Sequence, residues 1–254
     1  AYTASQTGSV FLALLAGLAA AGLTGMLVEV AIFRRLYARD HLHQVLATFG
    51  LILFFNEALA ILFGRQPLFA KIPETLSGAI ALPGGLNYPI YRLVILAVGA
   101  VVALGLYLLI KHTRAGMLVR AGSTNRETVQ ALGVNISLLY TAVFGLGAVL
   151  AGLAGAMAGP LLSVQIGMGE QILILTFVVI VIGGIGSVRG AVVGALLVGM
   201  VDTLVRAFLP GLLRAIMSAS DAYSLSSGFS SVSVYLLRAI VLLWRPRGLS
   251  PVHG

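Results

Sequence analysis

The stretch RAGMLVRAGSTNRETVQALGVN, residues 114–135, interrupts an otherwise apolar chain with polar and basic side chains. An apolar run precedes it and another follows it directly, and each is close to the roughly 20 residues that a helix needs to cross a membrane. A segment buried in lipid has no packing reason to be so polar. The stretch therefore predicts a short helix at the cytoplasmic membrane face, where another protein can bind it.

Composition places the whole chain in the same class. Of 254 residues, 59% are hydrophobic and 9% are charged, whereas soluble domains carry about 25% charged residues. A transmembrane barrel would show alternating segments of about 10 residues, and the sequence has no such alternation. We therefore expect an all-α, polytopic transmembrane helical bundle.

Charge and cysteine content exclude several functions. The net charge of +8 fits basic residues flanking membrane spans, and the chain lacks the aromatic and basic pattern of a nucleic-acid groove. The absence of Cys excludes thiol catalysis, disulfides and Cys-based metal sites. We predict no catalytic residues and no metal ligands, because no His, Asp and Glu cluster has suitable spacing.

We predict about seven spans in one transmembrane domain covering residues 1–254. The apolar runs are residues 10–33, 44–64, 90–110, 138–159, 170–183, 190–209 and 232–244. Placing the loop at 34–43 inside puts ten Lys and Arg residues inside and four outside, as the positive-inside rule requires. This orientation puts the N-terminus outside, the C-terminus inside and a coupling segment, residues 111–137, in the cytoplasm.

The segments that connect the predicted spans differ in composition and therefore in predicted structure. Four prolines and Gly84-Gly85 predict that external residues 65–89 form an irregular loop or a re-entrant turn. A Ser-rich external stretch, 210–231, is expected to carry a short surface helix near 212–217. The fifth span ends in GGIGS (183–187), so it either stops below the far interface or joins the sixth through a broken turn.

Small residues recur every four positions, which lets helix backbones approach closely. They pack either inside this chain or against a second membrane subunit. The three sets are Ala13, Gly17, Ala21 and Gly25; Gly147, Ala151, Gly155 and Gly159; and Gly186, Gly190 and Gly194.

A few polar residues fall at membrane depth. Glu29 is interpreted as an interfacial carboxylate at the inner end of the first span. An ionised Glu57 carboxylate at membrane depth would be costly, so it must pair with a cation, face water or be protonated. Two alternatives account for its position: an ion pair with Arg65, or a place in a path for solute or protons. Asp202 and Arg206 have the spacing of a local pair, whereas Arg238 has no obvious partner and faces either a cavity or a partner subunit. The candidates for a solute path are Asn56, Glu57, Thr176, Gly183 and Gly184.

The cytoplasmic stretch has its own helix signals. Thr124 and Glu127 fit a capping box that starts a helix of about two turns, which Gly133 would end. Val129 and Leu132 would form a small apolar face. This helix either connects two spans at the membrane interface or binds in a groove of a cytoplasmic partner protein. Its candidate contact residues are Ser123, Thr124, Asn125, Arg126, Glu127, Val129, Gln130, Leu132 and Gly133.

Five stretches together resemble a known family in their order and spacing. They are VEVAIFRRLYARD (28–40), LATFGLILFFNE (46–57), KHTRAGMLVRAGSTNRETVQALGVN (111–135), VIGGIGSVRGAVVGALLVG (181–199) and LLWRPRGL (242–249). The chain resembles, over roughly residues 25–250, the permease subunits of branched-chain amino-acid ABC importers and the related amino-acid, urea and amide permeases. The family has further membrane sequence upstream, including Asn-Phe-Ala-His-Gly, so we expect an N-terminal segment to be missing.

The resemblance implies a multi-pass protein of the bacterial inner membrane that works with partners. These are two ATP-binding subunits, a second identical or different permease subunit, a periplasmic or lipid-anchored binding protein, and membrane lipid, without nucleic acid. The chain would need no cofactor of its own, because neither Lys71 nor Lys111 lies in a Walker A motif and ATP would bind the partners. The alternatives are a stand-alone proton- or ion-coupled transporter relying on Glu57, Asp202 and Arg238, and a membrane enzyme.

Overall fold

The computed structural model describes residues 10–37, 39–68, 72–73, 76–82, 86–184, 186–214, 219–245 and 248–249. The chain divides into two compact units, Ala1–Met168 and Gly169–Gly254. The first unit contains α2 (Val10–Val28), η1 (Glu29–Phe33), α3 (Arg34–Leu36), α4 (His41–Phe63), β1 (Ala79–Leu82), β2 (Leu86–Pro89), α5 (Ile90–His112), α6 (Arg114–Thr124), α7 (Arg126–Ala131) and α8 (Ile136–Leu162). The second contains α9 (Met168–Gly183), α10 (Val188–Leu213) and α11 (Ala219–Trp244).

The prediction of a helical membrane protein is confirmed, and every predicted apolar run lies in a helix. Among the described residues, five helical segments are long and apolar enough to cross a membrane: 11–36, 42–63, 90–112, 136–162 and 188–213. Two apolar helical segments are shorter, 168–183 and 232–244. The total of seven crossings therefore stays a prediction.

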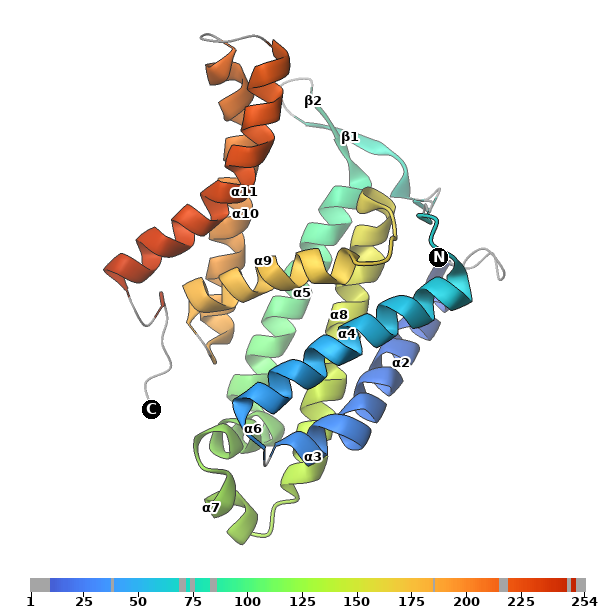
Figure 1. Ribbon diagram of the computed structural model, residues 1–254, viewed down its shortest axis with the longest axis vertical. Coiled ribbons are helices and arrows are strands. Elements are labelled where there is room, and N and C mark those ends of the chain that lie inside the picture. Colours follow the sequence, from blue (N-terminus) through green and yellow to red (C-terminus); the bar gives the residue numbers. More distant parts are fainter. Residues whose placement is uncertain are drawn as a thin grey trace. The chain divides into compact units, whose positions relative to one another are not determined.

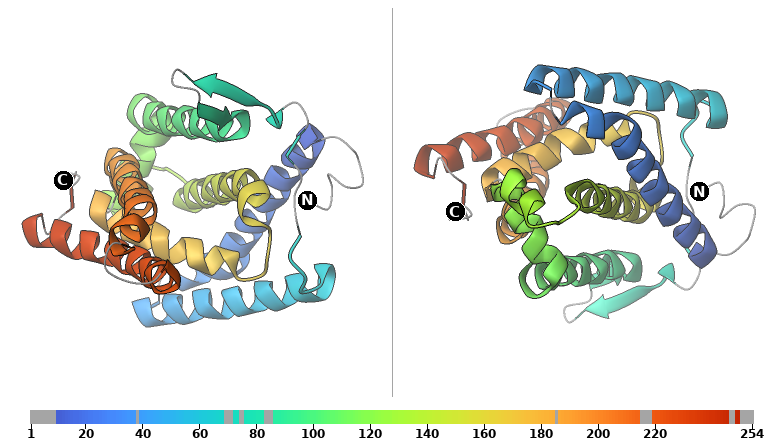
Figure 2. Two further views of the ribbon diagram at one scale, coloured as in Figure 1. Left: turned by 90° about the horizontal axis from the view of Figure 1, so that it is seen from above. Right: turned by 90° about the horizontal axis from the view of Figure 1, so that it is seen from below.

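Helix α2 packs along α8 in the first unit, as Figures 1 and 2 show (blue and yellow-green). A Cβ on Gly22 would lie 2.8 Å from Val149, and one on Gly152 would lie 2.8 Å from Ala21. The stripe containing Ala21 therefore packs partly inside this chain. On α8 the predicted stripe is displaced, because a Cβ on Gly147 would meet none of the described atoms within 4 Å.

In the second unit, α10 packs against α11 and against the end of α9. Val178, Ile182, Val198 and Val234 form its buried core. At the junction of α9 and α10, the Ser187 amide donates to the Gly184 carbonyl at 3.2 Å, and the Ser187 hydroxyl caps α10 by accepting a hydrogen bond from the Gly190 amide at 3.0 Å. These contacts agree with a turn between the fifth and sixth predicted spans, and where the fifth span ends in the membrane stays a prediction.

Two predicted connections are wrong in part. Residues 79–82 and 86–89 form an antiparallel pair of strands rather than irregular chain, with Ile80 opposite Tyr88. Pro89 is compatible with it because it lies at the strand end, where α5 begins. The Ser-rich stretch is largely helical, since α10 continues through Pro210 and α11 begins at Ala219. Part of the predicted helix at 212–217, and Gly84-Gly85, lie outside the described residues.

Candidate functional site

A cavity of about 300 Å³ with both polar and apolar walls lies at the end of α4. Its wall comes from two segments that are far apart in sequence, residues 56–67 and residues 165–166. Leu68 and Val164 hold these segments together, because each backbone amide donates to the other residue's carbonyl at 2.8 Å. The geometry thus creates a site that neither segment forms alone.

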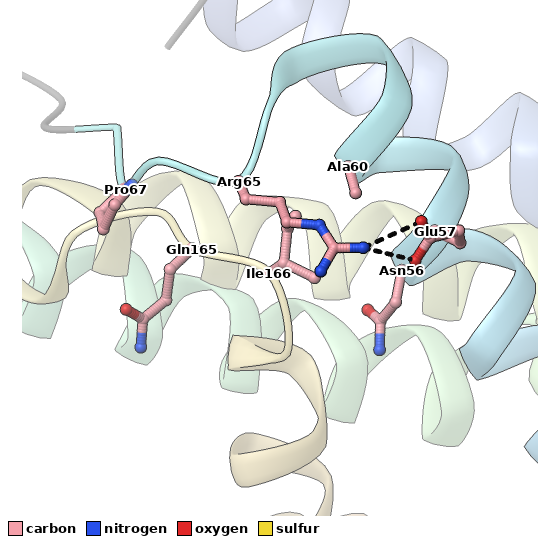
Figure 3. Close-up of a pocket in the computed structure, with 7 residues that line it drawn as sticks. All are labelled: Asn56, Glu57, Ala60, Arg65, Pro67, Gln165 and Ile166. Atoms are coloured by element: carbon pink, nitrogen blue, oxygen red, sulfur yellow. Dashed lines mark hydrogen bonds and ion pairs between the residues drawn. The ribbon is translucent and has the colours of Figure 1, made fainter.

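Opposite charges meet in this cavity, as Figure 3 shows. The Arg65 guanidinium donates to both carboxylate oxygens of Glu57, at 3.0 and 3.3 Å. The amide side chains of Asn56 and Gln165 add polar groups. Ala60, Pro67 and Ile166 supply apolar wall.

The predicted ion pair between Arg65 and Glu57 is present. Their side chains are 76% and 62% exposed, and an exposed pair contributes only about 0–1 kcal/mol to folding. Both charged groups therefore remain accessible to a solute. A small molecule that carries one positive and one negative group would match this arrangement.

The other three candidates for the solute path belong to the second unit. The Thr176 hydroxyl donates to the Ile172 carbonyl of its own helix at 2.8 Å. Gly183 lies against the backbone of Gly190, and Gly184 lies against Gly248. In this unit the two glycines permit close packing of backbone.

Residues 114–131, which are predicted to be cytoplasmic, form two helices, α6 and α7. Thr124 ends α6, and Asn125 caps α7 by accepting a hydrogen bond from the Thr128 amide at 3.0 Å. The predicted start at Thr124 is therefore displaced by one residue, whereas the six residues of α7 make about two turns, as predicted. The predicted end is confirmed, because Gly133 adopts φ +83° and its amide bonds to the Gln130 carbonyl.

Val129 of α7 and Leu132, the residue that follows the helix, do not form the predicted apolar face. Val129 is 5% exposed, whereas Leu132 is 77% exposed. Ser123, Asn125 and Gln130 are also exposed. The backbone of Thr124, Arg126 and Glu127 is described but their side chains are not, so their predicted contacts stay untested. Among the described side chains of residues 123–133, Leu132 is the large apolar one that is exposed.

Glu29 is not the interfacial carboxylate that the sequence predicts, because its side chain is 0% exposed. Its Oε2 accepts a hydrogen bond from the Thr141 hydroxyl of α8 and lies 3.5 Å from the Arg34 guanidinium. Sequence reasoning missed this cluster because pairs on an α-helix are separated by three or four residues, whereas Glu29 and Arg34 are separated by five.

Two further predictions concern the second unit. The pair between Asp202 and Arg206 is confirmed, with nitrogen and oxygen 2.9 Å apart. Arg238 has a partner that the sequence did not suggest, since its guanidinium lies 5.1 Å from the centre of the Phe177 ring. Such cation–π contacts offset part of the cost of a charge in an apolar setting.

Comparison with known proteins adds a further finding. Residues 1–243 match the family model described as the permease component of the branched-chain amino acid transport system. The high-affinity branched-chain amino acid transport system permease proteins BraD of Pseudomonas aeruginosa and LivH of Escherichia coli K12 are 27% and 25% identical to the chain. Each match covers 89% of this chain and 69% of the relative. A probable LivH permease protein of Methanocaldococcus jannaschii is 28% identical over 42% of this chain and 34% of its own length. No solved structure matches the chain.

Proposed function

The chain belongs to the family of branched-chain amino acid transport permeases, and from this premise we propose that it is the permease subunit of an ATP-driven importer for branched-chain amino acids. The family match over residues 1–243 is the observation that carries the proposal. It concerns transport rather than catalysis. The relatives whose names state a solute are all branched-chain amino acid permeases.

ATP would be hydrolysed by two separate subunits that contact α7. Leu132 supports this assignment, because a leucine that is 77% exposed in a polar segment is suited to a groove on a partner. When the ATP-binding subunits close, they would displace the segment from Ser123 to Gly133 and tilt the helices attached to it. No cofactor in this chain is then required.

Three further components complete the proposed importer. A second permease subunit, identical or different, would form the other half of the path. A periplasmic or lipid-anchored binding protein would deliver the solute to the outer face. The complex would lie in the bacterial inner membrane, with the C-terminus and residues 111–137 of this chain in the cytoplasm.

The cavity at Arg65 and Glu57 supports an amino acid as the solute. A free amino acid carries a carboxylate and an ammonium group, which match the guanidinium and the carboxylate of the cavity. The guanidinium and the carboxylate lie 3.0 Å apart, so each charge of the cavity has a partner of opposite sign. The apolar wall at Ala60 and Ile166 is suited to an aliphatic side chain.

Copurification and uptake test the proposal. The chain is expressed with the two ATPases, the second permease and the binding protein, purified, and placed in liposomes. We expect uptake of leucine that requires ATP. Leu132→Glu is expected to abolish recovery of the ATPases, whereas Leu212→Glu, at a position 67% exposed on α10, should leave it unchanged. Uptake by this chain without ATPases, or full recovery with Leu132→Glu, would contradict the proposal.

A further inference from the structure

The buried Glu29 carboxylate joins two helices from distant parts of the sequence. Its Oε2 bonds to Thr141, 112 residues away on α8, and the Arg34 guanidinium donates to the same Thr141 oxygen at 2.8 Å. The other oxygen of Glu29, Oε1, is buried and makes no hydrogen bond to any described residue. A buried carboxylate with hydrogen bonds to only one of its oxygens destabilises the fold. A contribution to the stability of this one conformation therefore does not explain why Glu29 is buried here.

Local backbone geometry creates this cluster. Five residues turn an α-helix by about 500°, which leaves the side chains of residues i and i+5 about 140° apart. Between α2 and α3 the chain instead forms the π-helical turn η1, in which the Arg34 amide bonds to the Glu29 carbonyl. This turn brings Arg34 to the same side as Glu29. Single π-helical turns are rare in proteins, and those that occur are often located at functional sites.

Thr141 has two possible acceptors for one hydrogen. Its oxygen is close to Glu29 Oε2, and it lies 2.9 Å from the Ser137 carbonyl of its own helix. A threonine hydroxyl carries a single hydrogen, so it can donate to only one of them at a time. Donation to Glu29 ties α8 to η1, whereas donation to Ser137 closes the bond within α8 and releases the carboxylate.

The same end of α8 is attached to the coupling segment. Tyr140, next to Thr141, donates to the Gly122 carbonyl of α6 at 3.4 Å and packs edge-on against Tyr37, with ring centres 5.4 Å apart. Ile136, at the start of α8, is 1% exposed and lies close to Gly122. A displacement of α6 and α7 therefore reaches the Thr141 hydroxyl through packed side chains of one short helical segment.

We propose that Glu29, Arg34 and Thr141 form a polar lock that transmits movement of the coupling segment to α2. The lock is closed when Thr141 donates to Glu29 and opens when the hydroxyl turns to Ser137. These are positioning residues, because they act through the helices that they join rather than on the solute. The inference rests on the proposed function, since the movement comes from the ATPase subunits.

The test measures both ATP hydrolysis and solute uptake by the complete complex in liposomes. Thr141→Val removes the hydroxyl with little change in shape. We expect it to assemble and to hydrolyse ATP, while uptake per ATP falls about tenfold, within the range for loss of one coupling contact. Thr141→Ser keeps the hydroxyl and should restore the ratio. Glu29→Gln, which loses the charge that faces Arg34, should lower it as Thr141→Val does.

The outcomes separate this inference from the proposed function. Failure of the wild-type chain to assemble with the ATPases, or uptake without ATP, overturns both. A wild-type complex that works, with unchanged uptake per ATP in Thr141→Val and Glu29→Gln, overturns the lock alone. Loss of assembly in Thr141→Val also overturns it, because the cluster would then serve only the fold. A matched control is Thr48→Val, whose exposed hydroxyl donates to the Val45 carbonyl of its own helix, α4, at 2.7 Å.

Discussion

At the scale of the residue, glycines decide how closely the helices of the second unit approach. A Cβ on Gly194 would lie 2.7 Å from the Val179 carbonyl oxygen, and one on Gly190 would collide with the Gly183 backbone. Backbone cannot rotate away as the end of a side chain does. The contact between α9 and α10 therefore depends on the absence of a side chain at these positions.

Gly190→Ala is expected to destabilise the second unit by about 1–3 kcal/mol, because the added methyl forces the two helices apart. Gly199→Ala on the same helix is the control, since a Cβ there meets none of the described atoms within 4 Å. Thermal unfolding of the purified protein in detergent measures the difference. Equal midpoints for the two variants would show that the close approach is not needed.

We expect the Arg65 and Glu57 pair to contribute to uptake rather than to folding. Loss of a hydrogen bond to a charged group costs about 1.5–3 kcal/mol, so Arg65→Ala should lower leucine uptake by about tenfold or more. Unfolding should change little, because the pair is exposed. Asp202→Asn removes the pair between Asp202 and Arg206, of which Asp202 is partly buried, and should leave uptake unchanged. Loss of uptake in both variants would show that the effect of Arg65→Ala is not specific to the cavity.

At the scale of the element, α7 is too short to be stable alone. Helices of fewer than about 12 residues are marginal in water, and α7 has six. Three features retain it in this chain: the Asn125 cap, the left-handed Gly133 and the buried Val129 side chain. Its position is thus set by the chain around it, which leaves Leu132 free for a partner.

Asn125→Ala should weaken α7 by about 1 kcal/mol, because the Thr128 amide loses its acceptor. This corresponds to about fivefold faster amide exchange over residues 126–131, measured by mass spectrometry. Gln130→Ala, an exposed change in the same helix, serves as control and should leave exchange unaltered. If Asn125→Ala exchanges like wild type, the cap does not hold the helix.

At the scale of the whole molecule, the orientation in the membrane is the main open prediction. The natural chain has no Cys, so a single introduced Cys reports its side of the membrane without background. Ser123 and Gln66 are both exposed, and the predicted topology places them on opposite sides of the membrane.

We expect an impermeant maleimide to label Gln66→Cys in intact cells. It should label Ser123→Cys only after the cells are opened, because residues 111–137 are predicted to be cytoplasmic. The Cys-free parent should not react in either case. Labelling of Ser123→Cys in intact cells would reverse the topology and would remove the contact with cytoplasmic ATPases.

The helical class, the order of the apolar helices and the end of α7 at Gly133 are all readable in the sequence. These features depend on local properties, namely the length of apolar runs and the left-handed backbone that glycine permits. The pair between Asp202 and Arg206 is readable for the same reason, since one turn of helix sets its spacing.

Only the folded chain buries Glu29, brings Gln165 to Arg65 and pairs β1 with β2. Each depends on residues that are distant in sequence or on a backbone irregularity: α8 covers Glu29, the Leu68 and Val164 bridge assembles the cavity, and η1 turns Arg34 toward Glu29. A sequence pattern reports which side chains one helix or strand can place together. Burial is a property of the neighbours, so it is decided when α2 and α8 pack.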